Sequence, residues 1–245
     1  MLEQYCVACQ GLGYAPATIR TRRYILQRVN GPVLDVSGAE LLRVISQPRS
    51  PASRRNYHNH LRSFWRDAHM LGWTDRPWPL EGWRPPPPPD HAPRHFTPEE
   101  QQRLLGMPDP QMRAVTVVGL LAGLRVSEVM SLRSFDCDGA RLWVQGKERD
   151  EYVPAHPKVV EVMQDWQPPV YSRPDKLSAA WRRHAAGVGV TGRFHSLRAS
   201  FAQNLLDAGH DVTVVQRALR HRSIAATMHY VRATDTAVAD AVSGL

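Results

Sequence analysis

Apolar side chains recur along most of this chain every three to four positions, which is the spacing of amphipathic helices. The clearest stripe follows Ser50 and Pro51, a pair that favours a helix start because proline suits the first helical position. This apolar stripe comprises Tyr57, Leu61, Phe64, Trp65 and Ala68. Basic residues recur every four positions on another face, at Arg54, His58, Arg62 and Arg66. The pattern predicts one long helix with a buried seam and a cationic ridge.

The second half of the chain carries clear signals for helix starts and stops. Residues 97–100 read Thr-Pro-Glu-Glu, which forms a capping box and predicts a helix to about Leu105. Another helix is expected over about 111–122, ended by Gly123. A further helix is expected over 126–132. The next segments alternate apolar and polar residues and flank a polar turn, so they predict a short hairpin at 141–145 and 151–154.

Five consecutive prolines, Pro85–Pro89, mark the strongest boundary in the chain. Such a run can enter neither a helix nor a central strand, and it favours an extended, semi-rigid spacer. A polyproline ligand for another protein is an alternative, but the position between two patterned regions favours a linker. The sequence thus predicts a mainly α fold with a small β-hairpin, divided into a helical domain (1–82), a linker (83–95) and a second domain (96–245).

The chain carries a formal net charge of +8 and a pI near 9.9, which indicates a polyanionic partner. Nucleic acid is the usual partner, and an anionic membrane surface is the rival. Residues 1–95 hold 13 arginines against 7 acidic residues, so most of the excess lies in the smaller half. Here the cationic ridge, reinforced by Arg20, Arg22 and Arg23, is predicted to contact DNA phosphates, with a solvated surface face as the alternative.

Neither the cysteines nor the histidines predict a metal site. Cys6 and Cys9 form a CxxC pair, but zinc needs two further ligands and Cys137 is alone, so small residues on a helix face explain the pair better. The eleven histidines show no HExxH or zinc-finger spacing. No apolar run approaches the length that crosses a bilayer, and the first residues lack signal-peptide character. We therefore expect a cytoplasmic protein without a membrane, metal or cofactor requirement.

Four polar clusters stand at predicted helix starts or turns of the second half, where side chains can converge. They are Arg125 with Glu128, which can orient the guanidinium; Gln145-Gly146-Lys147; His195 with Arg198; and Arg220-His221, followed nine residues after the histidine by Tyr230. Taken singly, each cluster is a weak signal, because such residues more often decorate the surface or pack than carry out chemistry. Their order and spacing are more specific.

In this order the clusters resemble the tyrosine recombinases, which include phage integrases, Xer-type resolvases and integron integrases. The matching stretches are FTPEEQQRLL, LLAGLRVSEVMSL, VQGKERDEYVP and FHSLRASFAQNLLDAGHDVTVVQRALRHRSIAATMHYVRA. The resemblance covers residues 96–245 and, more loosely, residues 1–80, which look like the family's core-binding domain. It implies the catalytic set Arg125, Lys147, His195, Arg198, His221 and Tyr230.

The resemblance also implies the chemistry. Tyr230 attacks a DNA phosphate and forms a 3′-phosphotyrosine, while Arg125 and Arg198 stabilise the charged transition state. Lys147 protonates the departing 5′-oxygen, His195 is an acid/base and His221 binds the phosphate. Because the phosphotyrosine conserves the bond energy, no nucleotide cofactor is needed.

Two features depart from the family pattern. Arg220 stands where the family usually has glycine, so the backbone there changes or a phosphate contact is added. The hairpin after Lys147 lacks the usual Gly-Asn and is one residue short, which puts the reach of this lysine in doubt.

By resemblance, the two domains form a clamp around double-stranded DNA, and four protomers, monomeric when free, assemble on two synapsed sites. The tail 231–245 docks on a neighbouring protomer, with a frayed terminus as the alternative. We expect no separate arm-binding domain, since the core-binding pattern starts at the first residues. We therefore expect integration or excision of a phage or mobile element, with a chromosomal resolvase as the alternative. An accessory factor that controls the direction of the reaction is also left open. Two other functions remain: a type IB topoisomerase, and a non-catalytic DNA-binding protein on a recombinase scaffold.

Overall fold

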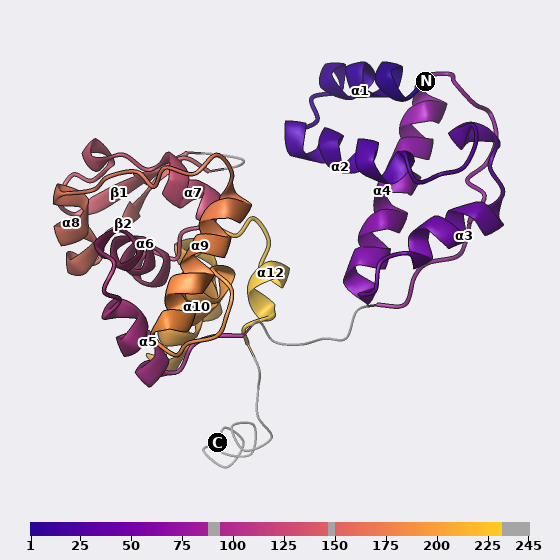
Figure 1. The fold of residues 1–245 in the computed structure, drawn as a ribbon. Coiled ribbons are helices and arrows are strands. Elements are labelled where there is room, and N and C mark those ends of the chain that lie inside the picture. Colours follow the sequence, from indigo (N-terminus) through magenta and orange to yellow (C-terminus); the bar gives the residue numbers. More distant parts are fainter. Residues whose placement is uncertain (88–93, 147–149, 232–245) are drawn as a thin grey trace, which may run out of the picture. The chain divides into compact units, whose positions relative to one another are not determined.

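The structure is a computed structural model that describes residues 1–87, 94–146 and 150–231. It divides into two compact units, Met1–Asp90 and His91–Leu245 (Figure 1). We call them the N-terminal and C-terminal units. Of the expected linker 83–95, residues 88–93 lie outside the described residues. Among the described residues no helix is both long and apolar enough to cross a membrane.

The described part of the N-terminal unit is helical. Its elements are α1 (Leu2–Gly11), α2 (Pro16–Leu26), the short 3-10 helix η1 (Val33–Asp35), α3 (Gly38–Ser46) and α4 (Pro51–Met70). Helix α4 packs against α2 and α3 and thereby joins the unit together. Its start is as expected, because the Ser50 hydroxyl accepts a hydrogen bond from the backbone N–H of Ser53. The apolar seam is confirmed at Leu61, Phe64, Trp65 and Ala68, which are buried.

An ion pair lies inside this helical core. Arg22 Nη1 donates to Asp67 Oδ2 over 2.7 Å, and the two side chains are 5% and 1% exposed. The Tyr5 hydroxyl donates to the same carboxylate oxygen over 2.9 Å, and Tyr14 donates to the other oxygen. Burial opposes the charge of Arg22, but Tyr14, Tyr5 and Asp67 together hold its pKa above the ordinary value. The prediction that Arg22 contacts DNA is therefore wrong, because its guanidinium is buried in the core and paired with Asp67.

The cationic ridge on α4 is only partly as predicted. Arg54, Arg62 and Arg66 are exposed, whereas His58 is 1% exposed and lies edge-on to the rings of Trp78 and Trp83. Burial, followed by the charges of Arg62 and Arg84, lowers the pKa of His58. His58 is thus a neutral core residue and cannot form part of a phosphate-binding face.

The C-terminal unit contains further helices and one small sheet. Its elements are α5 (Pro98–Leu105), α6 (Pro110–Leu121), α7 (Val126–Ser131), the 3-10 helix η2 (Ser134–Asp136), β1 (Arg141–Val144), β2 (Glu151–Pro154), α8 (Pro157–Gln164), α9 (Pro174–Gly187), α10 (His195–Asp207), α11 (Val212–Ala218) and α12 (Ala225–Met228). The mainly α fold class and the hairpin are confirmed. The strands are antiparallel, with Trp143 opposite Tyr152. The turn that joins them contains residues 147–149, which lie outside the described residues.

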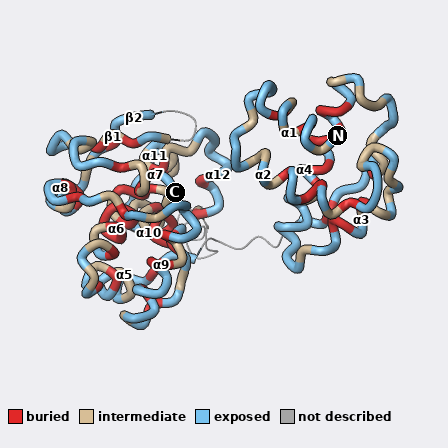
Figure 2. The backbone as a smooth tube through the Cα atoms, turned by 45° about the horizontal axis from the view of Figure 1, so that its top comes forward, coloured by how far each residue is buried: buried red, intermediate tan, exposed pale blue. Residues whose placement is uncertain are grey.

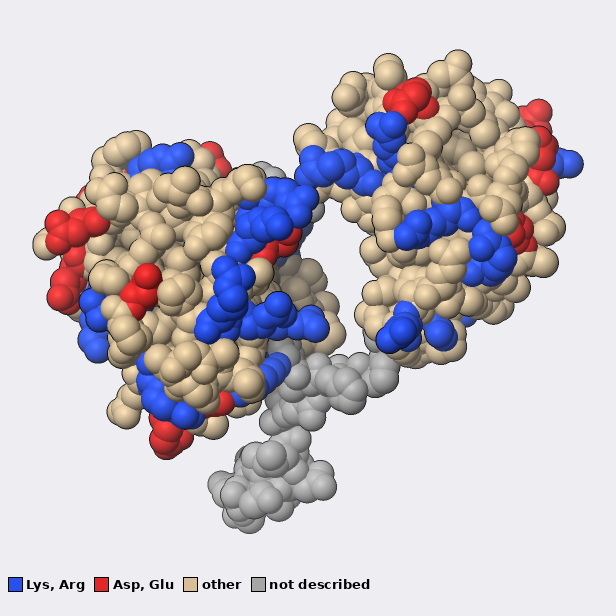
Figure 3. Space-filling model, viewed as in Figure 1, with Lys and Arg blue, Asp and Glu red and all other residues tan. Residues whose placement is uncertain are grey.

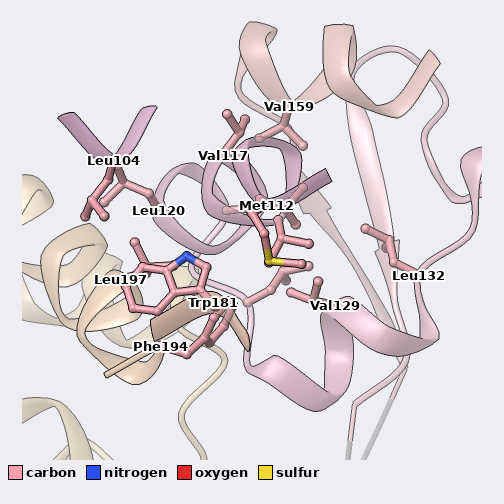
Figure 4. Close-up of a cluster of buried hydrophobic side chains, with 14 of the residues drawn as sticks. Leu104, Met112, Val117, Leu120, Val129, Leu132, Val159, Trp181, Phe194 and Leu197 are labelled. Atoms are coloured by element: carbon pink, nitrogen blue, oxygen red, sulfur yellow. The ribbon is translucent and has the colours of Figure 1, made fainter. Parts of the chain in front are cut away.

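Helix α6 is the centre of this unit and is buried along most of its length. It contacts α5, α7, α8 and α10, so apolar residues occur on several of its faces rather than in one stripe. Around it pack side chains from distant parts of the chain, including Val129, Val159, Trp181, Phe194 and Leu197 (Figure 4). The burial map shows the same pattern, with buried segments inside each unit and exposed segments outside (Figure 2). The core thereby fixes the ends of α6 and α10, where the polar clusters lie.

The predicted helix boundaries of this unit are confirmed to within a residue or two. Thr97 and Glu100 form the reciprocal capping box at the start of α5. The Asp109 carboxylate caps α6 by accepting from the backbone N–H of Met112. Helix α6 ends directly before the Ala122-Gly123 turn. These are local signals, so the sequence alone could predict them.

We expect Asp67→Asn to destabilise the N-terminal unit by about 3 kcal/mol, because it leaves the buried Arg22 cation without its counter-charge. Hydrogen exchange of the α4 amides in the full chain measures this local free energy of unfolding. Asp35→Asn is the matched control, since it removes an exposed pair with Arg76 and should change the free energy by less than about 1 kcal/mol. Equal exchange in the two variants would show that the buried pair contributes no more than a surface pair.

Candidate active site

Arg125 lies in the turn between α6 and α7. Gly123 in this turn has a φ of +61°, in the left-handed region that favours glycine. A Cβ atom at this position would lie 2.5 Å from Cδ1 of Phe201, so there is no space for a side chain either. The tight turn ends α6 and makes Arg125 the residue immediately before α7.

Glu128 holds Arg125 at two points, as its spacing predicts. Its Oε2 accepts from the backbone N–H of Arg125 over 2.8 Å, and its Oε1 accepts from Nη1 over 2.7 Å. The Glu128 side chain is 3% exposed, whereas that of Arg125 is 39% exposed. The carboxylate is therefore a buried anchor from which a partly open guanidinium extends.

Arg198 lies on α10 and is 1% exposed. Its Nη1 donates to the carbonyl of Gly123 over 2.5 Å, and its Nη2 donates to the carbonyl of Leu219. Its Nε is buried and has no hydrogen-bond partner among the described residues. This single guanidinium thus joins the turn before α7 to the turn after α11. One turn of helix earlier, the exposed His195 begins α10.

The end of α11 turns the chain toward the next two candidates. His221 N–H donates to the carbonyl of Gln216, and Arg220 N–H donates to that of Arg217. This pair of bonds is a Schellman motif, in which the residue in Arg220's position adopts a left-handed backbone. Arg220 indeed has a φ of +56°. The His221 ring then lies with Nδ1 at 2.8 Å from Oγ1 of Thr227.

Tyr230 follows α12 and is 8% exposed. Its ring packs in a cluster with Ala199, Ala202, Val215 and Leu219 from α10 and the α11 segment. It also stacks on the ring of His221, with an interplanar angle of 11° and 6.3 Å between the ring centroids. Packing in this cluster thus holds the Tyr230 ring beside the imidazole of His221.

Five of the six candidate catalytic residues converge. Arg198 bonds the carbonyls of Gly123 and Leu219, which lie two positions before Arg125 and His221. Tyr230 packs in one cluster with Leu219 and lies beside the ring of His221, while His195 begins the helix that carries Arg198. The sixth, Lys147, lies outside the described residues. In the part of the chain that is described, no cluster of three histidine, cysteine or acidic side chains could hold a metal ion.

The site concentrates positive charge. Burial, followed by the neighbouring guanidiniums of Arg125 and Arg220, lowers the pKa of Arg198 to about 9, so it remains a cation at pH 7. Burial also opposes ionisation of Glu128, but Arg220 and Arg125 hold its pKa below the ordinary value. One buried carboxylate thus faces three guanidiniums, and an anion entering the site would relieve their repulsion.

Both histidines are kept neutral at pH 7 by the same surroundings. Although the His195 side chain is exposed, partial desolvation by the surrounding protein and then the charges of Arg198 and Arg125 lower its pKa. Burial and the same guanidiniums lower the pKa of His221 to about 4. A neutral imidazole can accept a proton. Burial raises the pKa of Tyr230, although the two guanidiniums act in the opposite direction. The phenol is therefore protonated in the free protein and needs a base when it attacks.

The sequence did not reveal several groups that shape this site. The carbonyls of Gly123 and Leu219 carry no side-chain signal, and Thr227 was one of many small polar residues. Asp67 in the N-terminal unit was also missed. It did leave a signal, since an acidic residue between Trp65 and Ala68 interrupts an apolar stripe and so indicates a buried partner.

Residues 94–237 match the Phage integrase family, and the matched range contains the whole cluster. The chain belongs to the phage integrase family. It is 34% identical over 180 residues to the integrase/recombinase y4eF of Sinorhizobium fredii, covering 64% of this chain and 72% of that protein. It is 27% identical over 270 residues to the tyrosine recombinase XerA of Thermococcus onnurineus, covering 96% and 91%. The resemblance drawn from the motifs is confirmed, and this integrase-family chain is a tyrosine recombinase.

Solved structures of the phage integrase family share the fold. A lambda integrase dimer bound to a COC′ core site superposes with a TM-score of 0.74 at 15% identity, covering 94% of this chain and 93% of that chain. A XerA recombinase superposes with a TM-score of 0.53 at 20% identity, covering 99% and 96%. At these identities the likeness supports the architecture, and the residue roles depend on the geometry described above.

His221 should titrate near pH 4 in the folded protein, whereas an ordinary histidine titrates near 6.5. Between these values the unfolded chain binds a proton that the folded chain rejects, so the free energy of unfolding should fall as the pH is lowered from about 6.5 to 4. NMR of the imidazole Cε1–H gives the midpoint, and His221→Gln should remove its share of the pH dependence. A midpoint near 6.5 would contradict the described surroundings.

Proposed function

We propose that this recombinase cuts and rejoins DNA through a covalent bond between Tyr230 and a phosphate. The observation that carries the proposal is that Arg198 bonds the carbonyl of Gly123, two residues before Arg125, and the carbonyl of Leu219, which packs in one cluster with Tyr230. A phosphodiester is shielded by its own negative oxygens, so two cations beside a nucleophile are what its cleavage requires. We assign residues 96–245 as the catalytic domain and residues 1–82 as the core-binding domain.

In the proposed reaction the Tyr230 oxygen attacks phosphorus and loses its proton to a neutral histidine base, for which we assign His195. The bond from phosphorus to the 5′-oxygen breaks, and that oxygen takes a proton from Lys147, a role drawn from the family resemblance. Arg125, Arg198 and His221 hold the non-bridging oxygens. The product is a 3′-phosphotyrosine, and attack by a 5′-hydroxyl of another strand reverses the step.

We propose double-stranded DNA as the partner of both units. Lysine and arginine side chains occur on the visible face of each unit (Figure 3). On the N-terminal unit we assign phosphate contact to the exposed arginines of α2 and α4, which are Arg20, Arg23, Arg54, Arg62 and Arg66. Lambda integrase, which shares this fold, has been solved as a dimer bound to a core site and as a tetramer bound to a Holliday junction.

By analogy with the lambda integrase tetramer, we propose that four protomers, monomeric when free, act on two synapsed sites. An accessory factor that controls the direction of the reaction is compatible with this proposal. We further propose that the tail 231–245 docks on a neighbouring protomer. We also propose that the reaction integrates or excises a phage or mobile element. A topoisomerase would act without a specific site or synapsis, and a decayed scaffold would bind DNA without cutting it. Both differ from our proposal in a measurable step, the formation of a site-specific adduct.

Incubation with nicked DNA that bears the recombination site, in EDTA, should give a protein–DNA adduct that resists denaturant. Tyr230→Phe removes the nucleophilic oxygen, so the adduct should disappear while DNA affinity persists. Tyr152→Phe is the matched control, since its exposed ring lies on the hairpin and should leave the adduct unchanged. An adduct that survives Tyr230→Phe would locate the nucleophile elsewhere. Adducts on any sequence would favour the topoisomerase.

DNA affinity should fall steeply with salt because phosphate contacts release counterions. Replacing Arg54 and Arg62 by glutamine should reduce the slope of log K against log salt concentration by up to about 2, at about 0.9 per lost contact. Arg66 is left in place because it bonds the buried Asp67. Arg43→Gln is the control, since Glu40 already balances that charge. An unchanged slope in the double variant would remove Arg54 and Arg62 from the DNA interface.

A further inference from the structure

Arg220 adopts a backbone conformation that its side chain disfavours. Among the described residues it is the one non-glycine residue with a positive φ, at +56°. The Schellman bonds at the end of α11 require this left-handed conformation, in which an L-residue brings its Cβ close to the following carbonyl oxygen. Glycine would make the same turn without that cost. The side chain of Arg220 must therefore do something that offsets it.

That side chain forms a buried ion pair across the site. Arg220 Nη2 donates to Glu128 Oε2 over 2.7 Å, and the two side chains are 5% and 3% exposed. The partners are 92 residues apart in the chain and lie on different elements. Glu128 is also the carboxylate that holds the backbone and the guanidinium of Arg125. One buried carboxylate thus fixes two arginines at once.

These bonds close a ring. Arg198 joins the Gly123 carbonyl to the Leu219 carbonyl. On one side the chain runs from Gly123 to Arg125, whose guanidinium bonds Glu128. On the other side it runs from Leu219 to Arg220, whose guanidinium bonds the same carboxylate. Without the Arg220 bond the ring opens, and the segment that leads to His221 and Tyr230 loses one of its hydrogen-bonded links to the Arg125 turn.

We propose that Arg220 is a positioning residue. Through Glu128, it fixes the position of the Arg125 guanidinium relative to the segment that carries His221 and Tyr230. This inference rests on the proposed function, because the relative position of the guanidinium and the phenol matters only if both act on one phosphate. Small displacements of reacting groups slow a reaction strongly while leaving the groups themselves in place. Arg220 is thus expected to affect the rate of cleavage rather than the affinity for DNA.

Direct phosphate binding by Arg220 is the competing explanation. The charge of Arg220 is already balanced, because its Nη2 bonds the Glu128 carboxylate, whereas the bonds of Arg198 go to neutral backbone carbonyls. An arginine that contacts DNA should also contribute to affinity and should act whether or not Glu128 is charged. The two roles therefore differ in what happens when Glu128 is already altered.

A double-mutant cycle tests the proposal with the nicked, site-bearing DNA. Single-turnover adduct formation is measured with protein in saturating excess, and DNA affinity is measured separately. Arg220→Gly, which suits the left-handed backbone, should slow adduct formation by about tenfold or more at unchanged affinity. Glu128→Gln should slow it similarly, and the double variant should be no slower than Glu128→Gln because both act through one contact. Arg141→Gln, which removes an exposed pair with Asp138, should leave the rate unchanged.

Two results would overturn the proposal. One is an Arg220→Gly rate equal to that of the wild type, and the other is a further loss of rate or of affinity when Arg220→Gly is added to Glu128→Gln. Thermal melting confirms that each variant is folded, and Arg220→Asn, which also tolerates a left-handed backbone, replaces the glycine variant if it melts early. Failure of the wild type to form an adduct through Tyr230 would instead refute the proposed function.

Discussion

The buried guanidinium of Arg198 constrains the rest of the site. A cation removed from water needs partners for its N–H groups, and here two of them bond to backbone carbonyls of Gly123 and Leu219. Backbone carbonyls cannot be repositioned by a rotamer change, so the two turns that carry them are fixed relative to α10. These two turns determine the positions of Arg125 and His221, which each follow two residues later in the chain. The requirement to satisfy one buried charge therefore organises residues that are nearly a hundred positions apart.

The same arrangement leaves the site short of negative charge. Glu128 bonds both Arg125 and Arg220, whereas no carboxylate of the described residues bonds the guanidinium of Arg198. Burial, followed by the charges of the neighbouring guanidiniums, lowers the pKa of Arg198 and of both histidines. Fixed dipoles and cations that await an anion stabilise developing negative charge without reorganising. The folded chain thus holds in advance an arrangement that suits a phosphate, which explains why a recombinase can bury so many cations.

The N-terminal unit solves the same physical problem with a different outcome. Arg22 is buried as well, but its Nη1 donates to Asp67 and to the Tyr5 hydroxyl, and its guanidinium lies over the Tyr14 ring, so it is a structural residue. Arginines at neighbouring positions of the same helix, such as Arg23, stay exposed. Whether an arginine serves the core or a ligand therefore depends on what faces it across the fold.

The sequence by itself determined the features that depend on neighbours in the chain. Helix caps at Ser50 and Thr97, the stop at Gly123, the hairpin and the order of the family's motif residues are all encoded within a few positions, because hydrogen bonds at helix ends and turns are local. Only the tertiary structure decided that Arg22 and His58 are buried, and that Arg220 bonds Glu128. A period of four residues places side chains on one helix face, but burial of that face depends on elements that the spacing does not encode.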